Sequence, residues 1–91
     1  MNKAKAEQVF AAIREYHKST GDDITEDGWF LADHHHEGLS EGSWSLACEG
    51  YLEYDWPWLF TEELFKGNVS GLPDGIFLEP INGCTLGIHD G

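Results

Sequence analysis

The sequence predicts an α+β fold: an N-terminal helix packed on a small antiparallel sheet, a C-terminal hairpin and a possible short second helix. Three patterns lead to this prediction. Residues 3–18 space their apolar side chains as a helix does, residues 43–56 alternate apolar and polar side chains, and Asn82-Gly83 separates two apolar runs. With 91 residues, 41% of them hydrophobic, the chain has material for one small core, so we expect residues 1–91 to form a single compact domain.

The first predicted element is a helix over residues 3–18, "KAKAEQVFAAIREYHK". Alanine and unbranched side chains favour helices. Lys18 and Gly21 fit its carboxyl end, because a cation is stabilised by the negative end of the helix dipole and glycine often terminates a helix. One apolar stripe runs along the helix and consists of Val9, Phe10, Ile13, Tyr16 and His17.

A strand is predicted over residues 28–35, "GWFLADHH", because aromatic and branched side chains are common in strands. Its orientation stays open. Trp29 with Leu31 faces the core in one alternative. Phe30 with Ala32 does so in the other.

Residues 43–56 alternate with a period of two, with apolar side chains at even positions and serines or acids, including Ser45, at most odd ones. Two arrangements keep the apolar side chains on one face and the polar ones in solvent. One is a long strand that bends at Gly50. The other is a hairpin with the three-residue loop 49–51. Its pairs would be Cys48 with Leu52, Leu46 with Tyr54, and Trp44 with Trp56.

Pro57 is expected to end this strand, because proline lacks a backbone donor. A short helix is predicted over residues 61–67, "TEELFKG", with Thr61 as its cap and Gly67 at its end.

The C-terminal hairpin is predicted from a two-residue turn at Asn82-Gly83. Pro80 predicts that its strand lies at a sheet edge. The expected pairs are Ile81 with Cys84, Glu79 with Leu86, and Phe77 with Ile88.

Charge is distributed unevenly along the chain, whose formal net charge is -12. All acids except Glu7 and Glu15 follow Ser19, and Lys66 is the single basic residue in that part. Such a field repels nucleic acid and anionic lipid, and it attracts a basic protein surface. We therefore expect no direct nucleic acid binding, no membrane binding and a basic protein partner.

Cys48 and Cys84 are the only cysteines. No secretion leader opens the chain, and no apolar run approaches the roughly 20 residues that cross a bilayer. These features predict a cytoplasmic protein with two reduced thiols. In a second interpretation, the two cysteines face each other on neighbouring strands and oxidise.

The run His34-His35-His36 is the first candidate metal site. On a strand, His34 and His36 share a face, and His89 could join them. Structural zinc needs four ligands, and adjacent histidines lack the spacing of zinc motifs. We expect a solvated strand end and no cofactor, with metal binding or a pH-sensitive surface as alternatives.

The segment "YDWPWLF", residues 54–60, is the main candidate for a protein interface, because Tyr and Trp anchor protein contacts and acids steer a basic partner. In the alternative interpretation, both tryptophans belong to the core and the acids serve solubility alone. The predicted partner-binding residues are Glu49, Tyr51, Glu53, Asp55, Trp56 and Trp58.

These features predict a small acidic, non-enzymatic binding protein. The sequence has no Gly-rich phosphate loop and no serine elbow, and it shows no cleft for paired carboxylates. An alternative is an inhibitor that imitates nucleic acid, because alternate acids on a strand lie roughly 7 Å apart, as phosphates do.

The chain resembles small acidic uncharacterised proteins of actinobacteria and their phages. The resemblance spans residues 29–89 and rests on the "WSLACEG" segment, the Pro-Trp segment after it and the "LPDGIFLEPINGCTLGIH" hairpin. It implies no activity or site residue. It implies a phage or plasmid accessory factor that engages a host protein.

Overall fold

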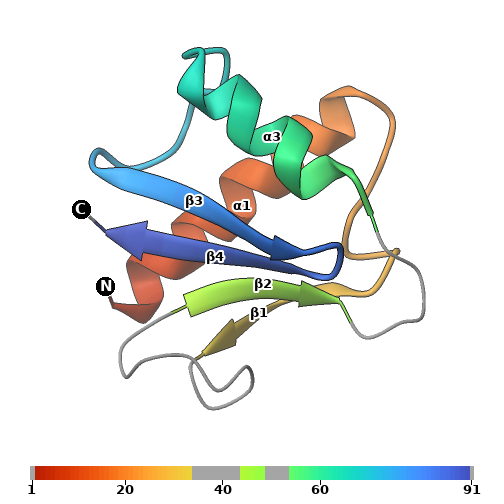
Figure 1. The fold of residues 1–91 in the computed structure, drawn as a ribbon, viewed down its shortest axis with the longest axis horizontal. Coiled ribbons are helices and arrows are strands. Elements are labelled where there is room, and N and C mark those ends of the chain that lie inside the picture. Colours follow the sequence, from red (N-terminus) through yellow and green to blue (C-terminus); the bar gives the residue numbers. More distant parts are fainter. Residues whose placement is uncertain (1, 34–43, 49–53, 91) are drawn as a thin grey trace.

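The computed structural model describes residues 2–33, 44–48 and 54–90 and has the α+β architecture expected from the sequence. Four strands form one antiparallel sheet in the order β1-β2-β4-β3 (Figure 1). The N-terminal helix, the short second helix and the C-terminal hairpin are all present. The elements are α1 (Lys3–Ser19), β1 (Trp29–Asp33), β2 (Trp44–Cys48), α3 (Trp56–Phe65), β3 (Ile76–Asn82) and β4 (Thr85–Asp90).

Helix α1 confirms the helix prediction and ends one residue later than expected. The Asn2 side chain accepts a hydrogen bond from the Lys5 backbone N–H at 2.8 Å, which satisfies one of the unpaired donors of the first turn. His17 and Lys18 lie in the last turn, and Gly21 follows with a φ of 92°. A positive φ suits glycine, so the chain can turn away from the helix there.

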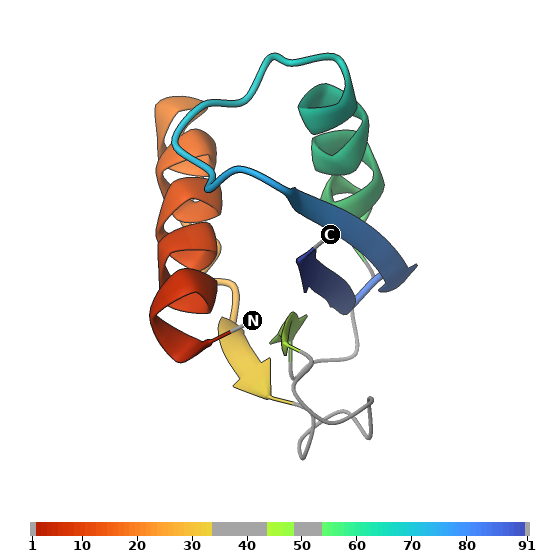
Figure 2. The same ribbon diagram turned by 90° about the vertical axis from the view of Figure 1, so that its left-hand side faces the viewer.

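Both helices lie on one face of the sheet, as Figure 2 shows. The core lies between these layers, and Val9 and Ile13 of α1 contribute to it together with Phe60 of α3. On β1, Trp29 is buried in this core and Leu31 packs against it. The structure thus selects the first of the two orientations predicted for this strand.

Strand β2 lies in the middle of the sheet, and this position corrects the prediction for residues 43–56. Leu46 pairs with Leu31 of β1 and Leu86 of β4, so both edges of β2 are occupied by strands other than the predicted one. The predicted pairs of Leu46 with Tyr54 and of Trp44 with Trp56 are therefore wrong. The long bent strand is also wrong in its last part, because the chain enters α3 at Trp56.

The faces of β2 were predicted correctly on one side only. Leu46 and Cys48 belong to the core, as the even positions should. Ser45 was expected in solvent, but it is fully buried, and its Oγ has no hydrogen-bond partner. A central strand is covered more completely than the alternation rule for a half-solvated sheet assumes.

Helix α3 begins five residues before the predicted helix. Pro57 lies in its first turn, where a missing N–H costs no helical hydrogen bond, so the proline that was expected to end a strand starts a helix. Thr61 is not a cap. Its hydroxyl donates to the Pro57 carbonyl oxygen at 2.7 Å within the helix.

The hairpin forms with a different register from the one predicted. Asn82 pairs with Thr85, and a β-bulge shifts the register between Pro80 and Asn82. The Asn82 side chain accepts from the Cys84 N–H at 2.8 Å, so asparagine opens the turn through its side chain and does not form its centre.

This shift exchanges the faces of β3. Phe77 pairs with His89 instead of Ile88, Glu79 with Gly87 instead of Leu86, and Leu78 takes the place opposite Ile88. Leu78 therefore lies on the buried face with Ile88, and Phe77 is exposed. The edge position that Pro80 predicted is confirmed, since β3 is the last strand of the sheet.

Candidate functional site

Helix α3 exposes large apolar side chains. Trp58, Leu59 and Phe65 are 47%, 60% and 94% exposed. A single exposed apolar residue is ordinary, but three on one ten-residue helix form a feature that folding does not explain.

The helical period separates an inner and an outer side of α3. Pro57 and Phe60 are buried, and Leu64 packs against the core four residues further on. Trp58 and Phe65 are seven residues apart and therefore lie on one side of the helix, away from this buried stripe. The sequence places the largest side chains on both sides of α3.

Strand β3 extends this surface. Figure 1 shows α3 beside β3, and a hollow of about 270 Å³ lies between them. Phe77, 54% exposed, borders the hollow together with Phe65. We call Trp58, Leu59, Phe65 and Phe77 the α3–β3 apolar surface. The residues that line the hollow are Thr61, Leu64, Phe65, Ile76, Phe77 and Leu78.

Phe77 is held in place by its neighbour across the ladder. Its ring stacks on the His89 ring with centroids 4.8 Å apart and planes 21° apart. His89 Nε2 lies 3.0 Å from Glu79 Oε1, so the imidazole is fixed by stacking on one side and by a carboxylate on the other. An anchored aromatic ring loses little conformational entropy when a partner covers it.

Acidic side chains accompany the apolar surface. Asp55 is exposed directly before α3, Glu62 is exposed on the helix and Glu79 on β3. Lys66 is the single basic residue of the described segment 54–90, and its ammonium lies 3.2 Å from Glu62 Oε1 and 3.9 Å from Glu63 Oε1. The glutamates raise the pKa of Lys66, so it stays protonated and offsets only part of their charge.

The two predicted interface tryptophans have different positions. Trp56 is half-buried, with its ring centroid 4.6 Å from those of both His17 and Trp29, so it closes the core at the start of α3. Trp58 is exposed. Asp55 lies next to them in solvent, whereas the predicted residues Glu49, Tyr51 and Glu53 lie outside the described residues.

Of the three predicted metal candidates, His89 alone lies within the described residues. His34 and His36 lie outside the described residues, and His89 contacts Phe77 and Glu79 as above. Over residues 2–33, 44–48 and 54–90, no three His, Cys, Asp or Glu side chains are grouped as metal ligands.

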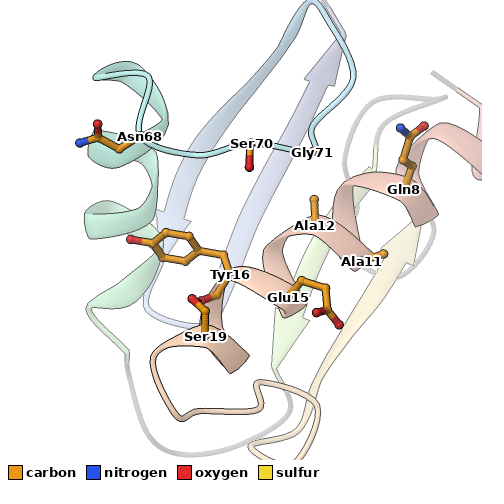
Figure 3. Close-up of a pocket in the computed structure, with 9 residues that line it drawn as sticks. All are labelled: Gln8, Ala11, Ala12, Glu15, Tyr16, Ser19, Asn68, Ser70 and Gly71. Carbon is orange, nitrogen blue, oxygen red and sulfur yellow. The ribbon is translucent and has the colours of Figure 1, made fainter.

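A second hollow, of about 470 Å³, lies between α1 and the segment that follows α3 (Figure 3). Its floor is made of small side chains, and the Gly71 backbone comes close to Ala12. Glu15, Gln8 and Asn68 supply polar groups at its margin. The hollow can accept hydrogen bonds and a closely approaching backbone. Its lining residues are Gln8, Ala11, Ala12, Glu15, Tyr16, Ser19, Asn68, Ser70 and Gly71.

Of the two histidines in the described residues, His17 is the more deeply buried. Its ring lies against Tyr16, Trp56 and Phe60, and its Nε2 has no hydrogen-bond partner. Burial lowers the pKa of His17, and the Asp22 carboxylate opposes this only in part. The neutral imidazole therefore acts as a packing residue.

Leu59 lies in the predicted interface segment 54–60, whereas Phe65 and Phe77 were not predicted as binding residues. A helical reading that begins at Trp56 would have found Phe65, because it stands seven residues after Trp58 and points the same way. Phe77 could not be found without the register, since its exposure follows from the bulge.

No helix among the described residues is long and apolar enough to span a bilayer. Comparisons with protein-family models, curated proteins and solved structures gave no match.

Proposed function

We propose that this chain is a small non-enzymatic binding protein that holds a partner protein on its α3–β3 apolar surface. The observation that carries the proposal is the exposure of Trp58, Leu59 and Phe65 on one helix. The partner is a protein with an apolar patch bordered by basic side chains.

Apolar burial supplies the affinity in this proposal. Aromatic side chains remove a large area from water when covered, and tryptophan is among the residues that most often dominate binding energy. Phe65 is almost completely exposed and has the most area to bury. The hollow between α3 and β3 offers a place for an apolar side chain of the partner.

Charge supplies the selectivity. Asp55, Glu62 and Glu79 are exposed beside the apolar residues, and the whole chain carries a formal charge of -12. Such a field accelerates encounters with a basic surface and repels an acidic one, more strongly at low salt. The same field discourages a second copy of this chain as the partner.

The biological setting is the finer part of the proposal. We place the protein in the cytoplasm as an accessory factor of phage or plasmid origin that engages a host protein. The resemblance to small acidic proteins of actinobacteria and their phages supports this setting.

The test is affinity capture from an actinobacterial lysate with three forms of the full chain. These are the unchanged protein, a Trp58→Ser/Phe65→Ser variant, and an Ala4→Ser/Lys18→Gln control on the exposed side of α1. A partner that the unchanged protein and the control retain, and that the variant binds at least tenfold more weakly, supports the proposal.

Circular dichroism before capture verifies that all three forms are folded. If every retained protein binds the variant as well as the unchanged chain, the proposal is wrong. Binding that weakens between low and moderate salt supports the role of the acids. Displacement of the partner by duplex DNA would favour the alternative, an inhibitor that imitates nucleic acid.

A further inference from the structure

Cys48 and Cys84 lie opposite each other at the junction of β2 and β4. Ala47 pairs with Thr85, so the next step of this antiparallel ladder joins the two cysteines. The Cys48 N–H donates to the Cys84 carbonyl oxygen at 2.9 Å, which fixes their register. Residues directly opposite in an antiparallel ladder extend their side chains from the same face of the sheet.

The backbone spacing suits a disulfide. Opposite residues that share a ladder hydrogen bond have Cα atoms about 5.5 Å apart. Disulfides join Cα atoms separated by about 4.4–6.8 Å, so the bond needs no large movement of the strands. The structure holds both side chains as thiols.

The two thiols have different access to solvent. Cys48 is buried, and its Sγ lies 3.4 Å from the Asp27 carbonyl oxygen. Cys84 is half-buried at the turn of the hairpin. Burial, followed by the neighbouring Cys84, raises the pKa of the Cys48 thiol. A reagent in solution therefore reacts first with the more accessible Cys84 thiol. The buried Cys48 thiol is less accessible to it.

We propose that Cys48 and Cys84 form a reversible cross-strand disulfide by exchange with a low-molecular-weight disulfide of the glutathione type. This site is independent of the proposed binding function.

The exchange has two steps. The Cys84 thiolate attacks one sulfur of the low-molecular-weight disulfide, breaks its S–S bond and releases one small thiolate. The Cys48 thiolate then attacks Cys84 Sγ in the mixed disulfide, forms the Cys48–Cys84 bond and releases the second small thiolate. Two electrons pass from the protein to the small disulfide, and the two cysteine protons end on the small thiols.

The disulfide would close a loop over residues 48–84, which contains α3 and β3. The Tyr54 N–H already donates to the Gly83 carbonyl oxygen at 2.9 Å, so the start of the loop is held next to the hairpin turn before oxidation. Closing a loop of this length restricts the unfolded chain far more than the folded one and should raise the melting temperature by roughly 10 °C or more.

The experiment incubates the reduced full chain with excess glutathione disulfide and analyses it by intact mass and by peptide mapping without reduction. We expect a loss of about 2 Da, the mass of two hydrogens, and one linked peptide pair containing Cys48 and Cys84. Dithiothreitol should restore both the mass and the lower melting temperature.

Two variants serve as controls. Cys48→Ser should stop at the mixed disulfide and keep one glutathione on Cys84, and Cys84→Ser should react much more slowly because its remaining thiol is buried. Wild-type protein that keeps two titratable thiols, that stops at the mixed disulfide, or that forms covalent dimers under these conditions would overturn the proposal. The wild-type measurements decide the matter even if a variant fails to fold.

Discussion

Helices α1 and α3 lie on the same face of the sheet but expose different kinds of side chain on their outer sides. Each buries one apolar stripe, represented by Ile13 in α1 and Phe60 in α3. The outer side of α1 carries polar side chains such as Gln8 and Glu15, whereas α3 turns Trp58 and Phe65 to solvent. Core formation accounts for all the large apolar residues of α1 and for only about half of those in α3. The exposed remainder in α3 is the basis of the proposed interface.

The largest expected effect is the loss of stability when a buried side chain of either helix is truncated. It tests whether the buried stripes of α1 and α3 contribute equally to the core. Phe60→Ala should lower the free energy of unfolding by about 3–5 kcal/mol, and Ile13→Ala by about 2–5 kcal/mol, because each leaves a cavity in a fully packed core. Urea denaturation followed by tryptophan fluorescence measures both. A cost below about 1 kcal/mol for Phe60→Ala would show that α3 is attached loosely, and the comparison would fail.

The next effect concerns the contact between the two helices at His17. Its pKa is lowered by burial, so the unfolded chain binds this proton more readily than the folded one. The resulting contribution to stability is complete above the ordinary imidazole pKa of 6.5 and is lost as the pH falls below it. His17→Gln should weaken this pH dependence, measured as melting temperature between pH 7.5 and pH 5, about one unit above and about 1.5 units below that value.

The matched control for this measurement is Ser19→Ala, which changes an exposed side chain without an ionisable group two residues further along α1. It should leave the loss of stability at acid pH unchanged. An equal effect of both substitutions would mean that the buried position of His17 does not matter.

A smaller effect belongs to the chain turn that holds α1 against the sheet. Arg14 Nε and Nη2 each donate to the Asp23 carboxylate at 3.2 Å, and Asp23 Oδ1 also accepts from the Thr25 N–H and hydroxyl. The Arg14 hydrogen bonds, and then those of Thr25, hold the pKa of Asp23 well below its ordinary 3.8. Asp23→Asn should lower the melting temperature at pH 7.

The deficit caused by Asp23→Asn should shrink as the pH falls below 3.8, because the wild-type carboxylate is then protonated in the unfolded chain and progressively in the folded one. Melting curves of both proteins from pH 7 to about pH 2 measure this. A difference that stays constant over this range would assign the effect to lost packing and not to the ion pair.

The smallest expected change in stability tests most directly whether the outer side of α3 serves the fold. Phe65→Ala should change the free energy of unfolding by less than about 0.5 kcal/mol, because the side chain is almost fully exposed. It should still weaken capture of the partner. A substantial loss of stability would mean that Phe65 serves the fold, and the case for an interface on α3 would lose its strongest residue.

The sequence was sufficient to predict α1 and the edge position of β3, because each depends on local chemistry: a helical stripe for α1 and a proline without a donor for Pro80. It was not sufficient for α3. Pro57 can end a strand or begin a helix, and only the tertiary placement of Trp56 against His17 and Trp29 selects the helix. Two-residue alternation over residues 43–56 continued by chance into the start of that helix.

The hairpin register shows a second limit. Asn82 fits either the centre or the first position of a turn, and its side-chain bond to Cys84 decides between them. The β-bulge between Pro80 and Asn82 then shifts the register by one residue, and this shift moves the side chains of β3 that precede it to the opposite face. Within the candidate site, Trp58 could be named from its sequence context, and Phe77 could not, because its exposure depends on this register. The binding roles assigned to both stay predictions.

The strand order has a consequence for how the chain folds. β4, the last strand in the sequence, occupies an inner position between β2 and β3, so the β1–β2 pair cannot be joined to β3 until β4 is in place. Pairing β2 with β4 closes a long loop, which slows folding relative to a sheet built only from hairpins. During synthesis on the ribosome, the sheet should therefore assemble late and nearly in one step. Until then, α1 has no complete sheet surface on which to pack.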